Sequence, residues 1–158
     1  MRVVLVHPEI PPNTGAIART CAATETELHL VEPLGFEISD RYLKRAGLDY
    51  WPYVNLTVHP DWETFLAHSC EKGGRLIAFS TRGASNYWDE NYVADDWLVF
   101  GKETAGLTGE QIDQCTTCVK IPMTQPKVRS LNLSVSVALG VFEARRQVFH
   151  QSPLQVSS

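Results

Sequence analysis

The sequence has no long hydrophobic run, only four cysteines and no excess of positive charge, and each absence excludes a class of protein. The apolar run at residues 3–6 is far too short for a signal peptide, and nothing approaches the roughly 20 apolar residues that cross a membrane. A formal net charge of −4 argues against a general nucleic-acid coat protein, because non-specific binding depends on many Lys and Arg contacts with phosphates. We therefore expect a cytoplasmic protein without a membrane partner, in which a local basic patch holds any nucleic acid.

The cysteines and histidines show no metal-binding pattern. Cys115 and Cys118 form one C-x-x-C, which by itself fits either a redox pair or half of a zinc site. No second cysteine pair and no histidine pair stands at ligand spacing. We therefore expect structural thiols, structural histidines and no metal.

The length and the pattern of apolar segments predict a single α/β domain. A chain of 158 residues with 44% hydrophobic content is long enough for one full core, which we expect in residues 1–150, followed by a flexible tail at 151–158. Strands are predicted at residues 2–7, 28–31, 54–58, 76–79 and 97–100. A helix is predicted at residues 16–24, with its start at residues 13–15. Further helices are predicted at 39–46, at 61–72 and after the capping box of Thr108 and Gln111, with a polar loop at 81–91. This alternation predicts a mainly parallel sheet flanked by helices.

The segment from Lys120 to Arg146 has the most distinctive pattern in the chain. A short strand ends at Ile121, a polar loop follows, and a helix is predicted over residues 132–149. The helix has two apolar stripes, one of Leu133, Val137, Val141, Ala144 and Val148 and one of Leu131, Val135, Leu139 and Phe142. A helix with two apolar faces needs two surfaces to pack against. We expect the domain core to cover one face and a partner subunit to cover the other, which predicts a homodimer.

Three loops follow predicted strands, at residues 8–19, 101–107 and 122–132. Ligands bind beyond the carboxyl ends of the strands in open parallel sheets, so we expect these loops to converge on one site. The loop that starts at Gly101 is neither a phosphate-binding P-loop nor a G-x-G-x-x-G dinucleotide motif. Its composition alone fits either a ligand loop or an ordinary glycine-rich turn.

The same loops carry three motifs that together resemble the SPOUT RNA methyltransferases: N-T-G-A-I-A-R at residues 13–19, V-F-G-K-E-T-A-G-L at 99–107, and I-P-M…R-S-L-N-L-S at 121–134. The resemblance covers essentially the whole chain. Within that superfamily, E-P-L-G-F at 32–36 and K-R-A-G-L-D-Y-W at 44–51 are similar to the short tRNA wobble-nucleotide 2′-O-methyltransferases. Val135 and Lys102 differ from residues common in that subgroup, and neither is assigned to chemistry.

The resemblance implies a SPOUT-type α/β knot, in which the C-terminal segment forms a deep trefoil, a homodimer, and S-adenosylmethionine bound bent in the knot. The residues that match the cofactor-binding positions of the family are Phe79, Gly101, Ile121, Ser130, Leu131 and Asn132. Strand core is an alternative role for Phe79 and Ile121, and helix capping is an alternative role for Asn132. S-adenosyl-L-homocysteine would be the product, and no metal is implied.

The catalytic residues implied by the resemblance are Arg19, Asn13 and Glu103. Arginine is a poor general base because its guanidinium stays protonated. We therefore expect Arg19 to fix a phosphate and to stabilise developing negative charge on the ribose oxygen, while the identity of the general base stays open. We expect Asn13 and Glu103 to hold Arg19 and the loops in place, and a simple surface ion pair is the alternative role for Glu103.

Five cations form the predicted RNA-binding patch of this acidic chain. Arg41, Lys44 and Arg45 fall at i, i+3 and i+4, which is one face of the predicted helix at residues 39–46. Lys127 and Arg129 add charge in the loop before the C-terminal helix. The implied reaction is 2′-O-methylation of the wobble nucleotide of tRNA, position 34, a cytidine or a modified uridine. The alternatives are 2′-O-methylation at another tRNA position or in rRNA, and a catalytically idle RNA-binding protein.

Overall fold

A computed structural model describes residues 1–38 and 49–151 of the chain, which fold around one seven-stranded parallel sheet. The strand order is β3-β2-β1-β6-β4-β7-β5, and every pair of neighbouring strands is parallel. The strands are β1 (Arg2–Val6), β2 (Glu27–Val31), β3 (Leu56–His59), β4 (Leu76–Phe79), β5 (Ser85–Asn86), β6 (Trp97–Phe100) and β7 (Thr117–Lys120). The helices are α1 (Pro11–Ala23), α3 (Trp62–Lys72), α4 (Gly109–Asp113) and α5 (Leu133–Gln151), with short 3₁₀ turns η1 (Trp51–Tyr53) and η2 (Tyr87–Asp89). The predicted α/β fold with a parallel sheet is confirmed.

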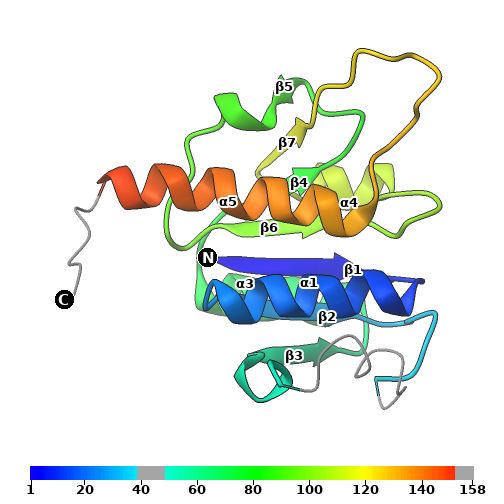
Figure 1. The fold of residues 1–158 in the computed structure, drawn as a ribbon, viewed down its shortest axis with the longest axis vertical. Helices are drawn as coiled ribbons and strands as arrows, with labels where there is room; N and C mark the ends of the chain where they lie inside the picture. Colours follow the sequence, from blue (N-terminus) through cyan, green and yellow to red (C-terminus); the bar gives the residue numbers. More distant parts are fainter. Residues whose placement is uncertain (39–48, 152–158) are drawn as a thin grey trace.

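Helices cover both faces of the sheet (Figure 1). Alternate residues of β1 point to opposite faces, so Val3 and Leu5 join a core beneath α1 and α5, whereas Val4 and Val6 join a core beneath α3. Strands buried on both faces need apolar side chains at every position, which is why β1, β4 and β6 read as continuous apolar runs. Among the described residues, no helix is both long enough and apolar enough to cross a membrane.

Local signals set the boundaries of the helices. The side chain of Asp61 accepts a hydrogen bond from the Thr64 amide at 2.7 Å and caps α3, and Gly73 at a φ of 74° follows the last turn. The capping box predicted at Thr108 and Gln111 is present at the start of α4. The predicted start of α1 at residues 13–15 is wrong, because Pro11 begins the helix; proline already has a helical φ and lacks only an amide that the first turn leaves unpaired.

The structure corrects one other assignment and leaves two outside its description. The segment at 81–91, predicted as loop, contains the short strand β5, which extends the sheet at the edge of β7, and the turn η2. Two residues of strand are too few to give an alternating pattern. The predicted helix at residues 39–46 and the predicted tail beyond residue 151 lie outside the described residues.

Helix α5 has the two apolar faces that the sequence predicts. Leu133, Val137, Val141 and Ala144 are buried against the sheet, whereas Val135 and Phe142 are 48% and 57% exposed. The helix can lie close to the sheet because position 140 is glycine: a Cβ there would be 2.9 Å from the ring of Phe79. The small residue at 140 therefore serves packing of α5 inside this chain.

Candidate active site

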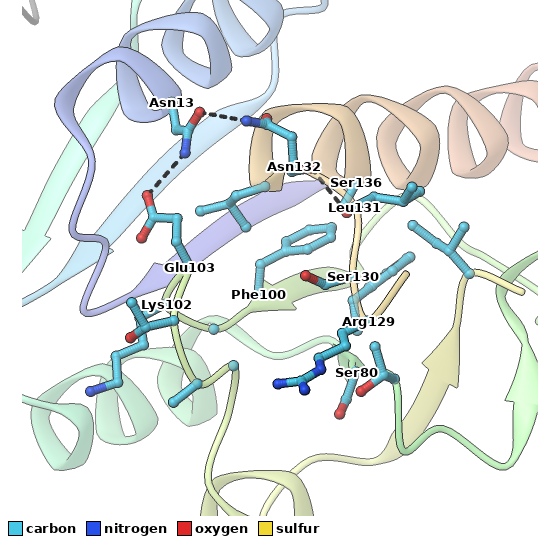
Figure 2. A pocket seen from close by; sticks show the side chains of 18 of the residues that line it. Asn13, Ser80, Phe100, Lys102, Glu103, Arg129, Ser130, Leu131, Asn132 and Ser136 are labelled. Carbon is cyan, nitrogen blue, oxygen red and sulfur yellow. Dashed lines mark hydrogen bonds between the residues drawn. The ribbon is translucent and has the colours of Figure 1, made fainter. Parts of the chain in front are cut away.

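A cavity of about 520 Å³ lies at the carboxyl ends of β4, β6 and β7, where the three predicted loops meet (Figure 2). It is lined by residues 79–82, 100–106 and 129–133, together with Ile10, Asn13, Ile121, Met123 and Ser136. All six residues predicted to bind a cofactor are among them. Phe79, Gly101 and Ile121 stand at or just beyond strand ends, and Ser130, Leu131 and Asn132 directly precede α5. A cavity of this volume is in the range that holds a ligand of cofactor size.

The floor of the cavity is apolar and its rim is mostly polar. The rings of Phe79 and Phe100 stack with centroids 4.5 Å apart, and Ile121 and Leu133 add aliphatic surface. Ser80, Ser130 and Ser136 bring hydroxyl groups to the lining, and the exposed main chain of the loops brings further donors and acceptors. An apolar slot with a few polar groups can hold a flat aromatic base and fix its orientation.

The loop after β6 can close only because Gly101 has no side chain. A Cβ at position 101 would be 2.1 Å from the carbonyl carbon of Gly106 and 2.2 Å from the amide nitrogen of Leu107. The amide of Gly106 donates to the carbonyl of Lys102 at 2.9 Å, and Gly106 itself has a φ of 67°. This tight turn carries Glu103 on its outer side, toward the first loop.

A relay of side chains joins the three loops (Figure 2). The Asn13 amide nitrogen donates to a Glu103 carboxylate oxygen at 3.3 Å, and the Asn132 amide nitrogen donates to the Asn13 oxygen at 3.0 Å. Asn132 also caps α5, since its side-chain oxygen accepts the Ser134 amide at 2.9 Å and the Ser134 hydroxyl at 2.6 Å. Asn132 thus caps α5 and also holds the third loop against the first.

Glu103 is held by main chain as well as by Asn13. Its carboxylate accepts hydrogen bonds from the amides of Glu9 at 2.8 Å and Ile10 at 3.1 Å. In return, the Glu9 carboxylate accepts the Thr104 hydroxyl at 2.9 Å and the Thr104 amide at 3.1 Å. The alternative of a simple surface ion pair therefore does not describe Glu103. Glu9 and Thr104 were not singled out from the sequence, although Glu9 lies in the first loop and Thr104 lies within the second motif.

The structure does not bring Arg19 to this cavity. Arg19 is exposed on α1, and the carbon of its guanidinium is 5.7 Å from the centroid of the Tyr50 ring. Tyr50 is itself anchored by a hydrogen bond from its hydroxyl to the Gly15 carbonyl at 2.8 Å. None of the hydrogen bonds of Asn13 and Glu103 within the described part of the chain goes to Arg19. Arg19 thus remains an exposed cation on the same helix as Asn13.

The predicted RNA-binding cations are divided by the structure. Arg129 lines the cavity, together with Arg82 and Lys102, so the cavity wall carries three cations. Lys127 is exposed two residues before Arg129 and is not part of the lining. Arg41, Lys44 and Arg45 lie outside the described residues.

This parallel α/β fold is the fold of the SpoU/SPOUT methyltransferases, as comparison with solved structures shows. The chain superposes on a structure that concerns the 2-OH methylation of C/U34 on tRNA with a TM-score of 0.88 and 46% identity, covering 92% of this chain and 94% of that one. It also superposes on an AdoMet-bound rRNA methyltransferase from Sinorhizobium meliloti with a TM-score of 0.84 and 26% identity, covering 92% of this chain and 55% of that one.

The chain belongs to the SpoU rRNA methylase family, whose model matches residues 1–142. A relative from Synechocystis is 57% identical over 148 residues, which are 94% of this chain and 97% of the relative. That relative is provisionally named a tRNA (cytidine(34)-2′-O)-methyltransferase. The family resemblance stated from the three motifs is confirmed.

Proposed function

We propose that this chain is a tRNA (cytidine(34)-2′-O)-methyltransferase, which transfers a methyl group from S-adenosylmethionine to the ribose of the wobble nucleotide. The observation that carries the proposal is the relay from Glu103 through Asn13 to Asn132, which closes the three motif loops on one cavity. Likeness to the protein of the C/U34 structure supports position 34 and a cytidine or a modified uridine as the target.

The cavity fits the cofactor in size and in chemistry. Phe79, Ile121 and Leu131 would hold the adenine in an apolar slot, and the main chain around Gly101 and Ser130 would supply hydrogen bonds. Asn132 would keep the last loop folded over the ligand. When bound, the cofactor supplies an electrophilic methyl group on a sulfonium, so the chain itself must position the ribose hydroxyl and stabilise its oxygen. In this proposal the transfer needs no metal.

Arg19 would act on the ribose–phosphate of the RNA and not on the cofactor. Its guanidinium is exposed above the face of Tyr50, where a phosphate can reach it. A permanently protonated group at this point can bind phosphate and stabilise negative charge developing on the 2′ oxygen, but it does not remove the proton. Arg41, Lys44, Arg45, Lys127 and Arg129 would bind the tRNA backbone.

The proposed assembly is a homodimer of one-domain subunits that works in the cytoplasm. An apolar groove runs along the exposed face of α5, lined by Val135, Leu139 and Phe142 and bordered by Ala16 and Tyr87. A second copy of α5 is the proposed occupant, because an exposed face with this much apolar surface favours association. Family membership also supports a trefoil knot, in which the segment from Lys120 to Arg146 passes through the preceding loop.

The reaction is tested with tRNA transcripts that lack a single 2′ hydroxyl. With radiolabelled S-adenosylmethionine, the protein should methylate a tRNA that has all its 2′ hydroxyls. It should not methylate a tRNA with 2′-deoxyribose at position 34, and it should methylate a tRNA with 2′-deoxyribose at position 32. Methylation that persists with the position 34 substrate would favour another tRNA position, and methylation of rRNA alone would favour the ribosomal alternative. Absence of transfer to any RNA, with RNA binding retained, would favour an idle binding protein.

A further inference from the structure

Three histidines that are far apart in the sequence meet on the side of the sheet away from the cavity. His29 lies in β2, His59 at the end of β3 and His68 in α3. One ring nitrogen of each lies within 4.8 Å of the others. His29 and His59 are 1% and 3% exposed and His68 is partly buried, and none of them lines the cavity at β4, β6 and β7. Their spacing of 30 and 9 residues follows no ligand motif, so nothing in the sequence groups them.

The hydrogen bonds define the tautomer of His29. Its Nε2 is 3.3 Å from a Glu27 carboxylate oxygen, and its Nδ1 is 2.9 Å from the Nε2 of His59. An ionised carboxylate can only accept a hydrogen bond, so the Nε2 of His29 carries the proton and donates it. The Nδ1 of His29 therefore has a lone pair, which accepts a hydrogen bond from the Nε2–H of His59. Burial lowers the pKa of His29 to about 4, and burial also lowers the pKa of His59.

The surroundings resemble those of a ligating histidine. A metal-bound imidazole normally donates its second ring N–H to a carboxylate or a carbonyl, and Glu27 accepts in that way from His29. Glu27 is in turn held by Lys72 at 3.5 Å and Arg2 at 3.6 Å. The Nε2 of His68 is buried and has no hydrogen-bond partner among the described residues, although most buried polar atoms have one. The rings of Trp97 and Phe65 pack beside His29 and His59.

We propose that His29, His59 and His68 bind one Zn²⁺ ion, with a water molecule as the fourth ligand. Three imidazole nitrogens with one oxygen ligand suit zinc, which binds histidine nitrogen at about 2.0–2.1 Å. Two such ligands of a tetrahedral ion are about 3.3 Å apart, so the 2.9 Å pair has to separate by only a few tenths of an ångström. On binding, the proton of His59 moves from Nε2 to Nδ1, and His68 rotates toward the ion. The ion would join α3 to β2 and β3 and so stabilise that edge of the sheet.

The test uses the full chain without a histidine tag, stripped with EDTA and dialysed. Calorimetry with ZnCl₂ should give one equivalent per chain, and saturating zinc should raise the melting temperature by roughly 5 °C, whereas MgCl₂ should do neither. CoCl₂ should give the visible absorption of a four-coordinate site. The site is independent of the proposed methyl transfer, so these readouts need no RNA and no methyl donor.

Variants separate this cluster from other zinc ligands. His68→Gln should remove binding and is the safest ligand variant to fold, because His68 is only partly buried. Glu27→Gln should weaken zinc affinity at least about tenfold and leave the stoichiometry unchanged. His7→Asn is the matched histidine control, since asparagine tolerates the φ of 54° found there, and it should bind normally. Absence of binding by the unaltered chain, normal binding by His68→Gln, or loss of binding in a Cys115→Ser/Cys118→Ser variant would each overturn the proposal.

Discussion

Asn13 and Glu103 are 90 residues apart in the sequence, and the Asn13 amide nitrogen lies 3.3 Å from a Glu103 carboxylate oxygen. The contact joins the first motif loop to the second, and Asn132 extends it to the third at 3.0 Å. Glu103 also accepts two main-chain amides of the first loop. A single carboxylate therefore sets the distance between two walls of the cavity.

Replacement of Glu103 should weaken the contact between the first and second loops. Glu103→Ala leaves the amides of Glu9 and Ile10 without partners and should cost about 1–3 kcal/mol of unfolding free energy. S-adenosylhomocysteine affinity should fall with it. Glu103→Gln retains one acceptor oxygen, so its unfolding free energy and its S-adenosylhomocysteine affinity should both fall less than those of Glu103→Ala. Urea unfolding and calorimetry measure the two effects, and equal behaviour of the two variants would show that the acceptor oxygens are unimportant.

The turn at Gly101 should be the most sensitive point of the cofactor site. Isolated protein should bind S-adenosylhomocysteine with or without EDTA, and Gly101→Ala should weaken that binding tenfold or more, because overpacking of this kind costs about 1–3 kcal/mol. Gly109→Ala is the matched control, since the nearest atom to a Cβ there is Arg82 Nη1 at 3.9 Å. Calorimetry measures the S-adenosylhomocysteine affinity of the two variants. Loss of this binding in EDTA would contradict the expectation that the cofactor site needs no metal.

Arg19→Ala should separate cofactor binding from chemistry. Because Arg19 is exposed outside the cavity, S-adenosylmethionine affinity should stay nearly unchanged while methyl transfer falls at least about a hundredfold. An Arg41→Ala/Lys44→Ala variant should instead lose tRNA affinity and part of its salt dependence. Single-turnover assays over a tRNA titration compare the two. Full recovery of the Arg19 variant at high tRNA would make Arg19 a binding residue only.

The exposed face of α5 should control assembly. Phe142→Glu places a charge on a side chain that is 57% exposed, so it should give a folded monomer in sedimentation at micromolar protein. Val141→Glu, one residue earlier, places the charge on a side chain with 0% exposure and should unfold the chain. A monomeric unaltered protein would exclude the dimer, and circular dichroism verifies the fold of each variant.

The thiols should be unreactive except at one position. Burial raises the pKa of Cys21 to about 12, burial with neighbouring Cys118 does the same for Cys115, and burial raises the pKa of Cys118. At pH 8 a thiol with a pKa near 12 is ionised in only about one molecule in ten thousand, so iodoacetamide should modify exposed Cys70 first. Mass spectrometry follows the sites, with Cys70→Ser as control. Rapid modification of Cys115 or Cys118 would instead support a redox role.

The sequence predicted most of what depends on local pattern. Continuous apolar runs identified the main strands, and because strands in a parallel sheet end at the same edge, the convergence of the three loops followed from their order. The two stripes of α5 were visible in its period, but the sequence did not show which stripe faces the core. The expectation that Val141 and Phe142 both point outward is wrong for Val141, which is buried.

What the sequence did not give are relationships set by tertiary contact. Strand β5 is a strand only because β7 lies beside it. Glu9 binds Thr104 across 95 residues, and His29 binds His59 across 30, without a motif that links either pair. The exposed position of Arg19 depends on where helix α1 turns that side chain. The family resemblance could name Arg19 but could not show where it lies relative to the cavity.

Phe79 and Phe100 are shared between two parts of the molecule. One side of this ring pair forms the cavity floor, and the other receives the backbone of α5 at Gly140. Helix α5 therefore meets the cavity in two ways: Leu133 and Ser136 line it directly, and Gly140 packs against the rings that form its floor. A ligand in the cavity contacts the same two rings against which α5 packs. Ligand binding and the position of α5 are therefore coupled in this fold.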